Sequence, residues 1–307
     1  MVSARHTVIV IVGPTATGKT SLAERLAQKL DGEIISADSM QVYKGMDIGT
    51  AKLPLGLRTV AYHCVDLVNP DKEFSAYAYQ KAARAAMDDI LARGKQPIVC
   101  GGTGLYVRAA LENHFFEDED ESLHELRQRL ETEALTLGAE AFHAKLAELD
   151  PQSAALIHPN NVRRVIRAFE WLEQGSSYVE QAQGFERSKE AYPTCYIGLI
   201  MPREELYARI NRRVEQMMEQ GLLEEVQGLL AKGYEQAFTA RQAIGYKELK
   251  CYLDGELSLE AAVASIQQAT RRYAKRQLCW FKRYQQIVWL DARLALDELT
   301  EQSRALL

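Results

Sequence analysis

The chain has 307 residues, of which 47% are hydrophobic and 26% are charged, and its 42 acidic and 37 basic residues give a formal net charge of -5. This composition excludes an intrinsically disordered chain and a uniformly basic protein that coats nucleic acid, so a polyanionic partner would need a local cationic patch. The length predicts two domains, or one large domain with an insertion.

Hydrophobic segments are short and the cysteines are scattered. The first apolar run, residues 8–12, ends at Gly13 and Pro14, and no later run approaches the ~20 apolar residues that a membrane span needs. The five cysteines form no C-x-x-C pair and the six histidines are equally dispersed, which argues against a disulfide framework and a structural zinc site. We therefore expect a cytoplasmic protein with reduced thiols and no membrane partner.

Strand and helix patterns alternate along the first third of the chain. Strands are predicted at residues 7–12, 33–37, 63–67 and 96–100, and helices at residues 19–30 and 75–93, with another helix starting after Gly104. Such alternation is typical of a parallel sheet with helical crossovers, in which ligands bind beyond the carboxyl ends of the strands. We therefore expect residues 13–20, Asp38 and Thr103, which follow three of these strands, to lie close together.

The pattern becomes helical after about residue 114. An acidic run at residues 117–121 is followed by helical patterns at residues 123–134, 139–149 and 160–174. A β-like run at residues 196–201 then returns the chain to the sheet, and the remainder is mostly helix with a last strand at residues 287–290. The sequence thus predicts an α/β core built from residues 1–114 and 191–307, with an all-α insertion at residues 115–190.

A phosphate-binding motif lies between the first strand and the first helix. Residues 13–20 match G-x-x-x-x-G-K-[ST] in the strand–helix context that the motif requires. The N–H groups of such a loop point at a phosphate, Lys19 adds positive charge, and the Thr20 hydroxyl is a ligand for Mg²⁺. We therefore predict that a di- or triphosphate is bound, with Mg²⁺ as cofactor, by Gly13, Pro14, Thr15, Ala16, Thr17, Gly18, Lys19 and Thr20.

An acidic residue follows the second strand, at an unusual place. P-loop ATPases and GTPases present an Asp at a strand end to hold the metal, but here the strand at residues 96–100 ends in Gly-Gly-Thr. The acid is Asp38, and a carboxylate beside a bound phosphate would be repelled unless it serves a metal or takes a proton from an attacking group. This position favours a catalytic role, and the alternative is that Asp38 only caps a helix or a turn.

Cationic side chains are concentrated near the C-terminus. No acid lies between Glu260 and Asp291, and aromatic residues are interleaved with the cations of this span, which are Arg271, Arg272, Lys275, Arg276, Lys282 and Arg283. Most of them fall on one broad face of a helix, an arrangement that suits a nucleic-acid backbone with unstacked bases. The alternative is an amphipathic helix whose aromatics fill the core and whose cations are merely solvated.

Two smaller groups of arginines have equally open interpretations. Arg163, Arg164 and Arg167 share one face of a helix in the predicted insertion, either as a second contact to a polyanion or as solvated surface. Arg209 and Arg213 lie one helical turn apart, either to complete a phosphate site or to pair with nearby glutamates.

Several motifs resemble those of bacterial tRNA dimethylallyltransferases. The similar segments are residues 13–20, 36–52, 101–106, 158–164, 242–248 and 274–277, in the order expected for the family. The resemblance covers nearly the whole chain and implies a P-loop NTPase-like sheet with a mobile helical insertion. It implies transfer of a dimethylallyl group from dimethylallyl diphosphate to N6 of the adenosine 3′-adjacent to the anticodon, in tRNAs that read codons beginning with U.

The resemblance also implies roles for individual residues. Lys19 and a Mg²⁺ ion near Thr20 would stabilise the leaving diphosphate, which Arg213 would contact. Asp38 would accept the proton from the amine, and Thr103 would help to hold the reacting groups. The tRNA anticodon stem-loop would be bound, by a monomer, through Asp38, Ser39, Met40, Gln41, Arg163, Arg164, Arg167, Gln242, Gly245, Tyr246, Lys247, Lys275, Arg276 and Lys282.

The residues also fit two other functions. A P-loop nucleoside or small-molecule kinase would use the same loop for ATP and would not need the cationic helix near the C-terminus. A non-catalytic RNA-binding module with a nucleotide switch would bind tRNA without forming a product.

Overall fold

The computed structural model describes residues 7–113, 122–186, 189–234 and 242–307. The chain divides into two compact units, of which the first contains Met1–Leu111 and Ala191–Leu307 and the second contains Glu112–Glu190. Within the described residues, no helix combines the length and the apolar character that crossing a membrane would require.

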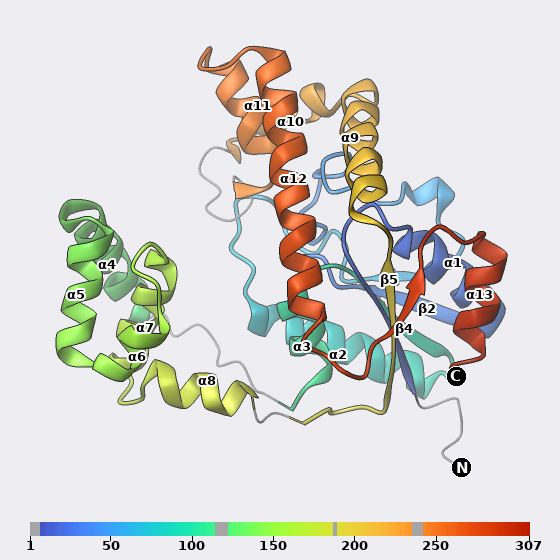
Figure 1. Cartoon of the computed structure of the whole chain (residues 1–307), viewed down its shortest axis with the longest axis horizontal. Coiled ribbons are helices and arrows are strands. Elements are labelled where there is room, and N and C mark those ends of the chain that lie inside the picture. The colour runs from blue at the N-terminus through green and yellow to red at the C-terminus, as the bar shows by residue number, and fades with distance from the viewer. Residues whose placement is uncertain (1–6, 114–121, 187–188, 235–241) are drawn as a thin grey trace. The chain divides into compact units, whose positions relative to one another are not determined.

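The first unit contains a parallel sheet. Within the described residues it has six strands in the order β3-β2-β4-β1-β5-β6 (Figure 1). Their bounds are β1 Val8–Val12, β2 Gly32–Ser36, β3 Tyr62–His63, β4 Gln96–Cys100, β5 Thr194–Ile200 and β6 Val288–Asp291. All residues of β1, β2 and β4 are buried, which explains why β1 is a continuous apolar run and why β2 and β4 are apolar or small except for Glu33 and Gln96 near their starts.

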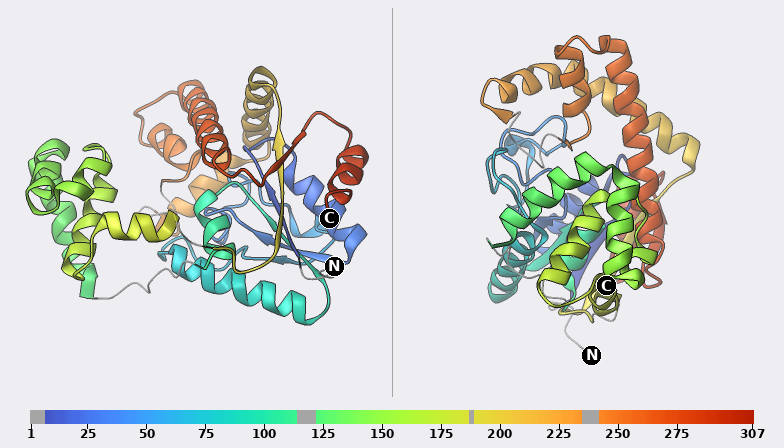
Figure 2. Two further views of the ribbon diagram at one scale, coloured as in Figure 1. Left: turned by 60° about the horizontal axis from the view of Figure 1, so that its bottom comes forward. Right: turned by 90° about the vertical axis from the view of Figure 1, so that its left-hand side faces the viewer.

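Helices cover the sheet in the first unit. They are α1 Lys19–Leu30, α2 Ala76–Ala92, α3 Gly104–Leu111, α9 Arg203–Glu219, α10 Leu222–Leu230, α11 Tyr246–Leu253, α12 Leu259–Phe281 and α13 Leu296–Arg304. The helix α1 packs Leu22 and Leu26 into one core cluster with Ile9 and Ile11 of β1, and the Ser75 hydroxyl caps α2 by accepting from the N–H of Ala78. Figure 2 shows α1 beside α13 and α2 beside α3.

In the described residues of the second unit, the regular elements are helices, apart from an isolated bridge between Glu112 and Glu190. Its helices are α4 Ser122–Leu137, α5 Ala139–Leu149, α6 Pro151–Leu156, α7 Val162–Glu173 and α8 Tyr178–Glu186. A separate core forms around Phe142 and Phe169, whose ring centroids lie 5.2 Å apart. Glu170 is buried beside this core, and its carboxylate accepts from Arg127 at 2.6 Å and from Arg167 at 2.9 Å, which balances its charge.

The predicted α/β fold with a parallel sheet is confirmed, but one predicted strand is largely wrong. The strand expected at residues 63–67 is limited to β3, because Cys64 and Asp66 have φ values of 60° and 56° and turn the chain away. The N–H of Asp66 instead bonds to the carbonyl of Gln41 at 3.0 Å. The helices α6 and α8 were not predicted, and the acidic run at residues 117–121 lies outside the described residues.

Candidate functional site

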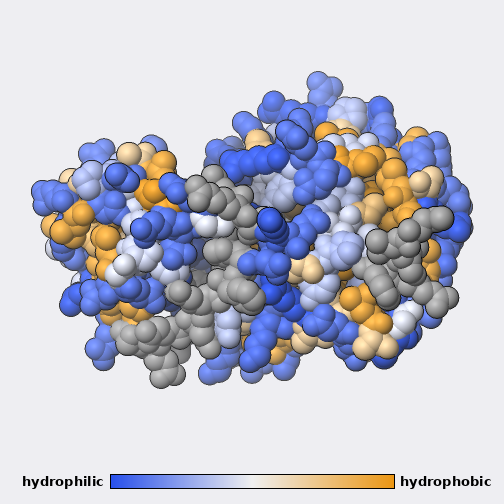
Figure 3. Space-filling model, turned by 90° about the horizontal axis from the view of Figure 1, so that it is seen from below, coloured by the Kyte–Doolittle hydropathy of each residue, from blue (hydrophilic) through white to orange (hydrophobic). Residues whose placement is uncertain are grey.

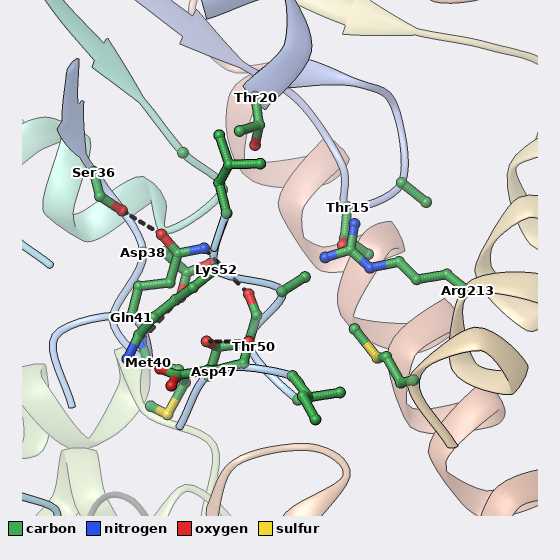
Figure 4. Close-up of a pocket in the computed structure, with 18 of the residues that line it drawn as sticks. Thr15, Thr20, Ser36, Asp38, Met40, Gln41, Asp47, Thr50, Lys52 and Arg213 are labelled. Atoms are coloured by element: carbon green, nitrogen blue, oxygen red, sulfur yellow. Dashed lines mark hydrogen bonds and ion pairs between the residues drawn. The ribbon is translucent and has the colours of Figure 1, made fainter. Parts of the chain in front are cut away.

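A cavity at the carboxyl edge of the sheet collects most of the predicted core site residues. It has a volume of about 980 Å³ and is lined entirely by the first unit. Its walls come from the loop after β1, the segment after β2, the end of β4, and side chains of α9 and α12 (Figure 4). The predicted residues that line it include Thr15, Lys19, Thr20, Asp38 and Arg213.

The loop after β1 needs its glycines and is braced by its own side chains. Gly13 has a φ of 138°, and a Cβ there would lie 2.5 Å from a carbonyl oxygen of β5; Gly18, with a φ of 87°, directly precedes α1. The Thr17 hydroxyl and the Lys19 ammonium donate to the carbonyl of Pro14 at 2.8 and 2.7 Å. The positive end of α1 thus lies at the cavity wall, where an anion is favoured.

The cationic side chains at the cavity have perturbed pKa values. Burial lowers the pKa of Lys19 to about 8, and the charge of Arg213 acts in the same direction, whereas Cys100 and Asp38 oppose it. Burial likewise lowers the pKa of Arg213, against the attraction of Asp38. Figure 4 shows the guanidinium of Arg213 extending toward Thr15. An anionic ligand between these groups would remove their mutual repulsion.

Asp38 both stabilises a turn and faces the cavity. Its Oδ1 accepts from the N–H of Met40 at 2.9 Å, so the turn-forming alternative describes part of its role. Burial raises the pKa of the Asp38 carboxyl, although the N–H groups of Met40 and Gln41 and the charges of Lys19 and Arg213 oppose the shift. A carboxylate with a raised pKa is a stronger base, as proton acceptance requires.

The neighbours of Asp38 are held by further hydrogen bonds. Thr103 Oγ1 accepts from the N–H of Ser39 at 3.1 Å, so Thr103 supports the segment after β2 from the end of β4. Gln41 accepts from the Ser36 hydroxyl at 2.8 Å and donates to the carbonyl of Thr50 at 3.1 Å. Ser39, Met40 and Gln41 all line the cavity, but the amide of Gln41 is already engaged in holding the loop.

Sequence reasoning missed Glu225 of α10, which organises another wall of the cavity. Its carboxylate accepts from the N–H groups of Asp47, Ile48 and Gly49 at 2.9, 2.8 and 3.2 Å and from the Tyr246 hydroxyl at 2.5 Å. A Cβ at Gly49 would overlap the Tyr246 ring, so the glycine permits this packing. The sequence carried no usable signal, because a glutamate on an amphipathic helix usually faces solvent.

The residues predicted to bind tRNA around the start of α11 differ from one another in exposure. Gln242 and Gly245 line the cavity, and Lys247 is exposed. Tyr246 is fully buried and donates to Glu225, so its side chain has no exposed surface for the tRNA contact that the sequence predicts.

The helix α12 has the exposed cationic face that the spacing predicts. Among its cations and those just after it, the exposed ones are Arg272, Lys275, Arg276, Lys282 and Arg283, while Ala274, Gln277 and Phe281 are buried on the opposite side. Arg276 also lines the cavity, whereas Arg271 donates to Asn211 Oδ1 at 2.6 Å and is engaged within the fold. In Figure 3, hydrophilic side chains predominate on the face shown, and hydrophobic ones form separate patches.

Only part of each smaller arginine group has the predicted surroundings. Arg163 and Arg164 are exposed on α7, but Arg167 pairs with Glu170 and lies over the Trp171 ring, 4.1 Å from its centroid. Arg213 reaches the cavity, whereas Arg209 is exposed elsewhere, 3.5 Å from the carbonyl of Ala292. Of the two arginines that could complete a phosphate site, only Arg213 therefore lies at the cavity.

The donor set at the cavity fits a magnesium ion that is held mainly by its ligand. Within the described part of the chain, no group of three His, Cys, Asp or Glu side chains is placed to hold a metal. Mg²⁺ is usually bound through substrate phosphates, water and one or two protein oxygens. The exposed hydroxyl of Thr20, at the cavity wall beside Lys19, is such an oxygen.

Comparison with known proteins identifies similar chains and structures. A family model described as IPP transferase matches residues 41–284, and one described as isopentenyl transferase matches residues 6–54. A tRNA dimethylallyltransferase of Geobacillus thermodenitrificans is 49% identical over 92% of this chain and 90% of its own. A crystal structure of a tRNA isopentenylpyrophosphate transferase from Bacillus halodurans is 41% identical with a TM-score of 0.72, over 98% of this chain and 95% of that one.

A more distant structure shares the fold as well. It is a eukaryotic dimethylallyltransferase acting on tRNA, 31% identical with a TM-score of 0.80, over 98% of this chain and 77% of that one.

We expect Glu225→Ala to lower the free energy of unfolding by about 1–3 kcal/mol, because it leaves the backbone donors of residues 47–49 and the Tyr246 hydroxyl without their acceptor. Urea denaturation measures the effect. Glu224→Ala, which removes an exposed carboxylate from the same turn of α10, is the matched control and should leave the midpoint unchanged. Equal midpoints for the two variants would contradict the assignment.

The depressed pKa of Lys19 predicts that diphosphate affinity falls as pH rises above about 8. A bound anion raises the pKa of Lys19, so above pH 8 binding must take up a proton, and the Kd should increase up to tenfold per pH unit. An alkyl diphosphate suits the titration, since phosphate esters lose their last proton at about pH 6.

Calorimetry between pH 7 and pH 9.5 checks the effect. Lys19→Arg should remove the slope because the guanidinium stays charged, while Lys81→Arg on the surface of α2 should keep it. If the Kd of Lys19→Arg still rises with pH above 8, the titrating group is not Lys19.

Proposed function

The chain belongs to the IPP transferase family of tRNA dimethylallyltransferases, so it transfers a prenyl group to tRNA, and we propose that it carries a dimethylallyl group from dimethylallyl diphosphate to N6 of the adenosine 3′-adjacent to the anticodon. The proposed acceptors are tRNAs that read codons beginning with U. The kinase alternative is not favoured, because relatives of this name match over 92% of the chain. The observation that supports the proposal is one cavity with a phosphate loop, the half-buried carboxyl of Asp38 and a cation from α12.

The residues around the phosphate loop suit the departure of a diphosphate. The bond between the allylic carbon and the diphosphate oxygen breaks, and the negative charge that develops on that oxygen needs stabilisation. Lys19 and Arg213 supply positive charge at the cavity wall, and the start of α1 supplies N–H donors. A bound Mg²⁺, when present, would add positive charge at the phosphate oxygens beside the Thr20 hydroxyl.

Asp38 suits the other half of the reaction. The exocyclic amine of adenine is a poor nucleophile because its lone pair is delocalised into the ring. As the N6–carbon bond forms, the amine must lose one proton, and the Asp38 carboxylate accepts it. The raised pKa of Asp38 favours this transfer, and the N–H of Met40 holds the carboxylate in place.

The substrates also need suitable walls. Met217 lines the cavity with apolar surface, and the buried side chains of Val214 and Leu222 also lie at its wall, which suits the five-carbon dimethylallyl chain. The adenine must leave its stack to reach Asp38, as base-modifying enzymes generally require, and the exposed cations of α12 would hold the flanking phosphates. We also propose that the enzyme acts as a monomer, in the cytoplasm where tRNA is found.

We expect Asp38→Asn to lower kcat for prenyl transfer by about 10²–10⁴-fold, because the amide keeps the bond to the N–H of Met40 but cannot accept the proton. Transfer is followed by mass spectrometry of N6-prenylated adenosine in unmodified tRNA supplied with Mg²⁺ and dimethylallyl diphosphate. Binding of tRNA should stay within about threefold of wild type, and Asp71→Asn, on the exposed surface, is the control. Turnover at the wild-type rate would exclude Asp38 as the proton acceptor.

Lys275→Ala should weaken tRNA binding and reduce the slope of log K against log salt by about one, because Lys275 is exposed on α12 and lies outside the cavity. The KM for dimethylallyl diphosphate should not change. A salt titration of anticodon stem-loop binding measures the slope, with Lys81→Ala on α2 as the control. The same slope in Lys275→Ala and wild type would show that the cationic face of α12 does not contact the tRNA backbone.

A further inference from the structure

The buried amide of Gln277 on α12 joins two loops that end neighbouring strands. Its Oε1 accepts from the N–H of Thr15 at 2.8 Å, and its Nε2 donates to the carbonyl of Gly102 at 3.0 Å. The side chain is 5% exposed, so water does not compete for either bond. One amide thereby holds the phosphate loop after β1 against the loop after β4.

The glycines after β4 are shaped to receive α12. A Cβ at Gly102 would overlap the amide of Gln277, and a Cβ at Gly104 would overlap the indole of Trp280, which lies nearly one turn further along the helix. Residues 101–104, Gly-Gly-Thr-Gly, stand where P-loop ATPases and GTPases have a strand-end Asp, and their lack of side chains at Gly102 and Gly104 lets α12 pack closely against them. The fit is specific, because both overlaps involve side chains from the buried side of α12.

A second link connects the same helix to the segment that carries Asp38. Burial raises the pKa of Tyr273, one turn before Gln277, to about 12, and its hydroxyl lies close enough to Thr103 and Gln277 for both to oppose the shift. Thr103 in turn accepts from the N–H of Ser39, which directly follows Asp38. Side chains of α12 thus contact the phosphate loop directly and approach, through Thr103, the segment that carries Asp38.

We propose that Gln277 is a positioning residue for prenyl transfer, which fixes the phosphate loop so that the diphosphate lies at the correct distance from Asp38. The proposal rests on the proposed function, because it assumes that residues 15–20 hold the diphosphate of the prenyl donor. Its chemistry is specific to glutamine: one neutral group must accept from Thr15 and donate to Gly102. Because Thr15 donates to Gln277, the diphosphate uses the remaining N–H groups of the loop.

A double-mutant cycle between Gln277 and Gly102 tests the proposal. Gln277→Ala and Gly102→Ala should each raise the Kd for dimethylallyl diphosphate about tenfold, by removing or displacing the amide. The double variant should bind no more weakly than Gln277→Ala alone, because the added Cβ at position 102 then enters vacated space. Binding of the anticodon stem-loop should stay within about twofold in all three, since Gln277 faces away from the cations, and Gln285→Ala in the exposed segment after α12 is the control.

Three results would overturn the proposal: an unchanged Kd for the diphosphate in the single variants, additive losses in the double variant, or equal weakening of diphosphate and tRNA binding. Gln277→Glu provides a second measurement if Gln277→Ala fails to fold. It keeps the volume and the acceptor for Thr15 but sets a carboxylate oxygen against the carbonyl of Gly102, so it too should raise the Kd. If wild-type protein binds the diphosphate but yields no prenylated adenosine, the proposed function fails, whereas this inference is judged by the binding cycle alone.

Discussion

Parallel pairing of the strands β1, β2 and β4 determines where the three loops at the cavity begin. Ile11 of β1 and Ser36 of β2 are both in register with Cys100 of β4, so the three strands end at nearly the same level. The phosphate loop, Asp38 and the glycine segment then emerge side by side. Segments far apart in the sequence are thereby brought to one edge by backbone hydrogen bonds alone, before any side chain of the site contributes.

Polar side chains from the C-terminal helices then hold these loops in place. Glu225 binds the backbone of residues 47–49, and Gln277 binds the backbone of Thr15 and Gly102. The groups that suit the chemistry, Lys19 and Asp38, are set in surroundings that shift their pKa values toward neutrality from opposite sides. The exposed cations of α12 lie on the opposite side from Gln277, so binding of a polyanion and support of the loop share one helix, although the net charge of the chain is -5.

Local signals allowed much of the fold and the centre of the site to be predicted. The helix at residues 19–30 and the strand at residues 96–100 match the structure to the residue, because a glycine turn and a buried apolar run mark their ends. The strand expected at residues 63–67 is largely wrong because long-range bonds to the segment after β2 override its pattern. The roles of Glu225 and Gln277 could not be predicted, since each depends on contacts between a helix and loops that are distant in the sequence.

The order of the strands has a consequence for how the chain folds as it is synthesised. The strand β1 bonds to β4 on one side and to β5 on the other, and Glu112–Glu190 are made before β5. At about 5–20 residues per second, those residues alone add roughly 4–16 s to translation. Throughout that interval one edge of β1, a strand composed only of valine and isoleucine, lacks its β5 partner, which exposes it to pairing with another chain.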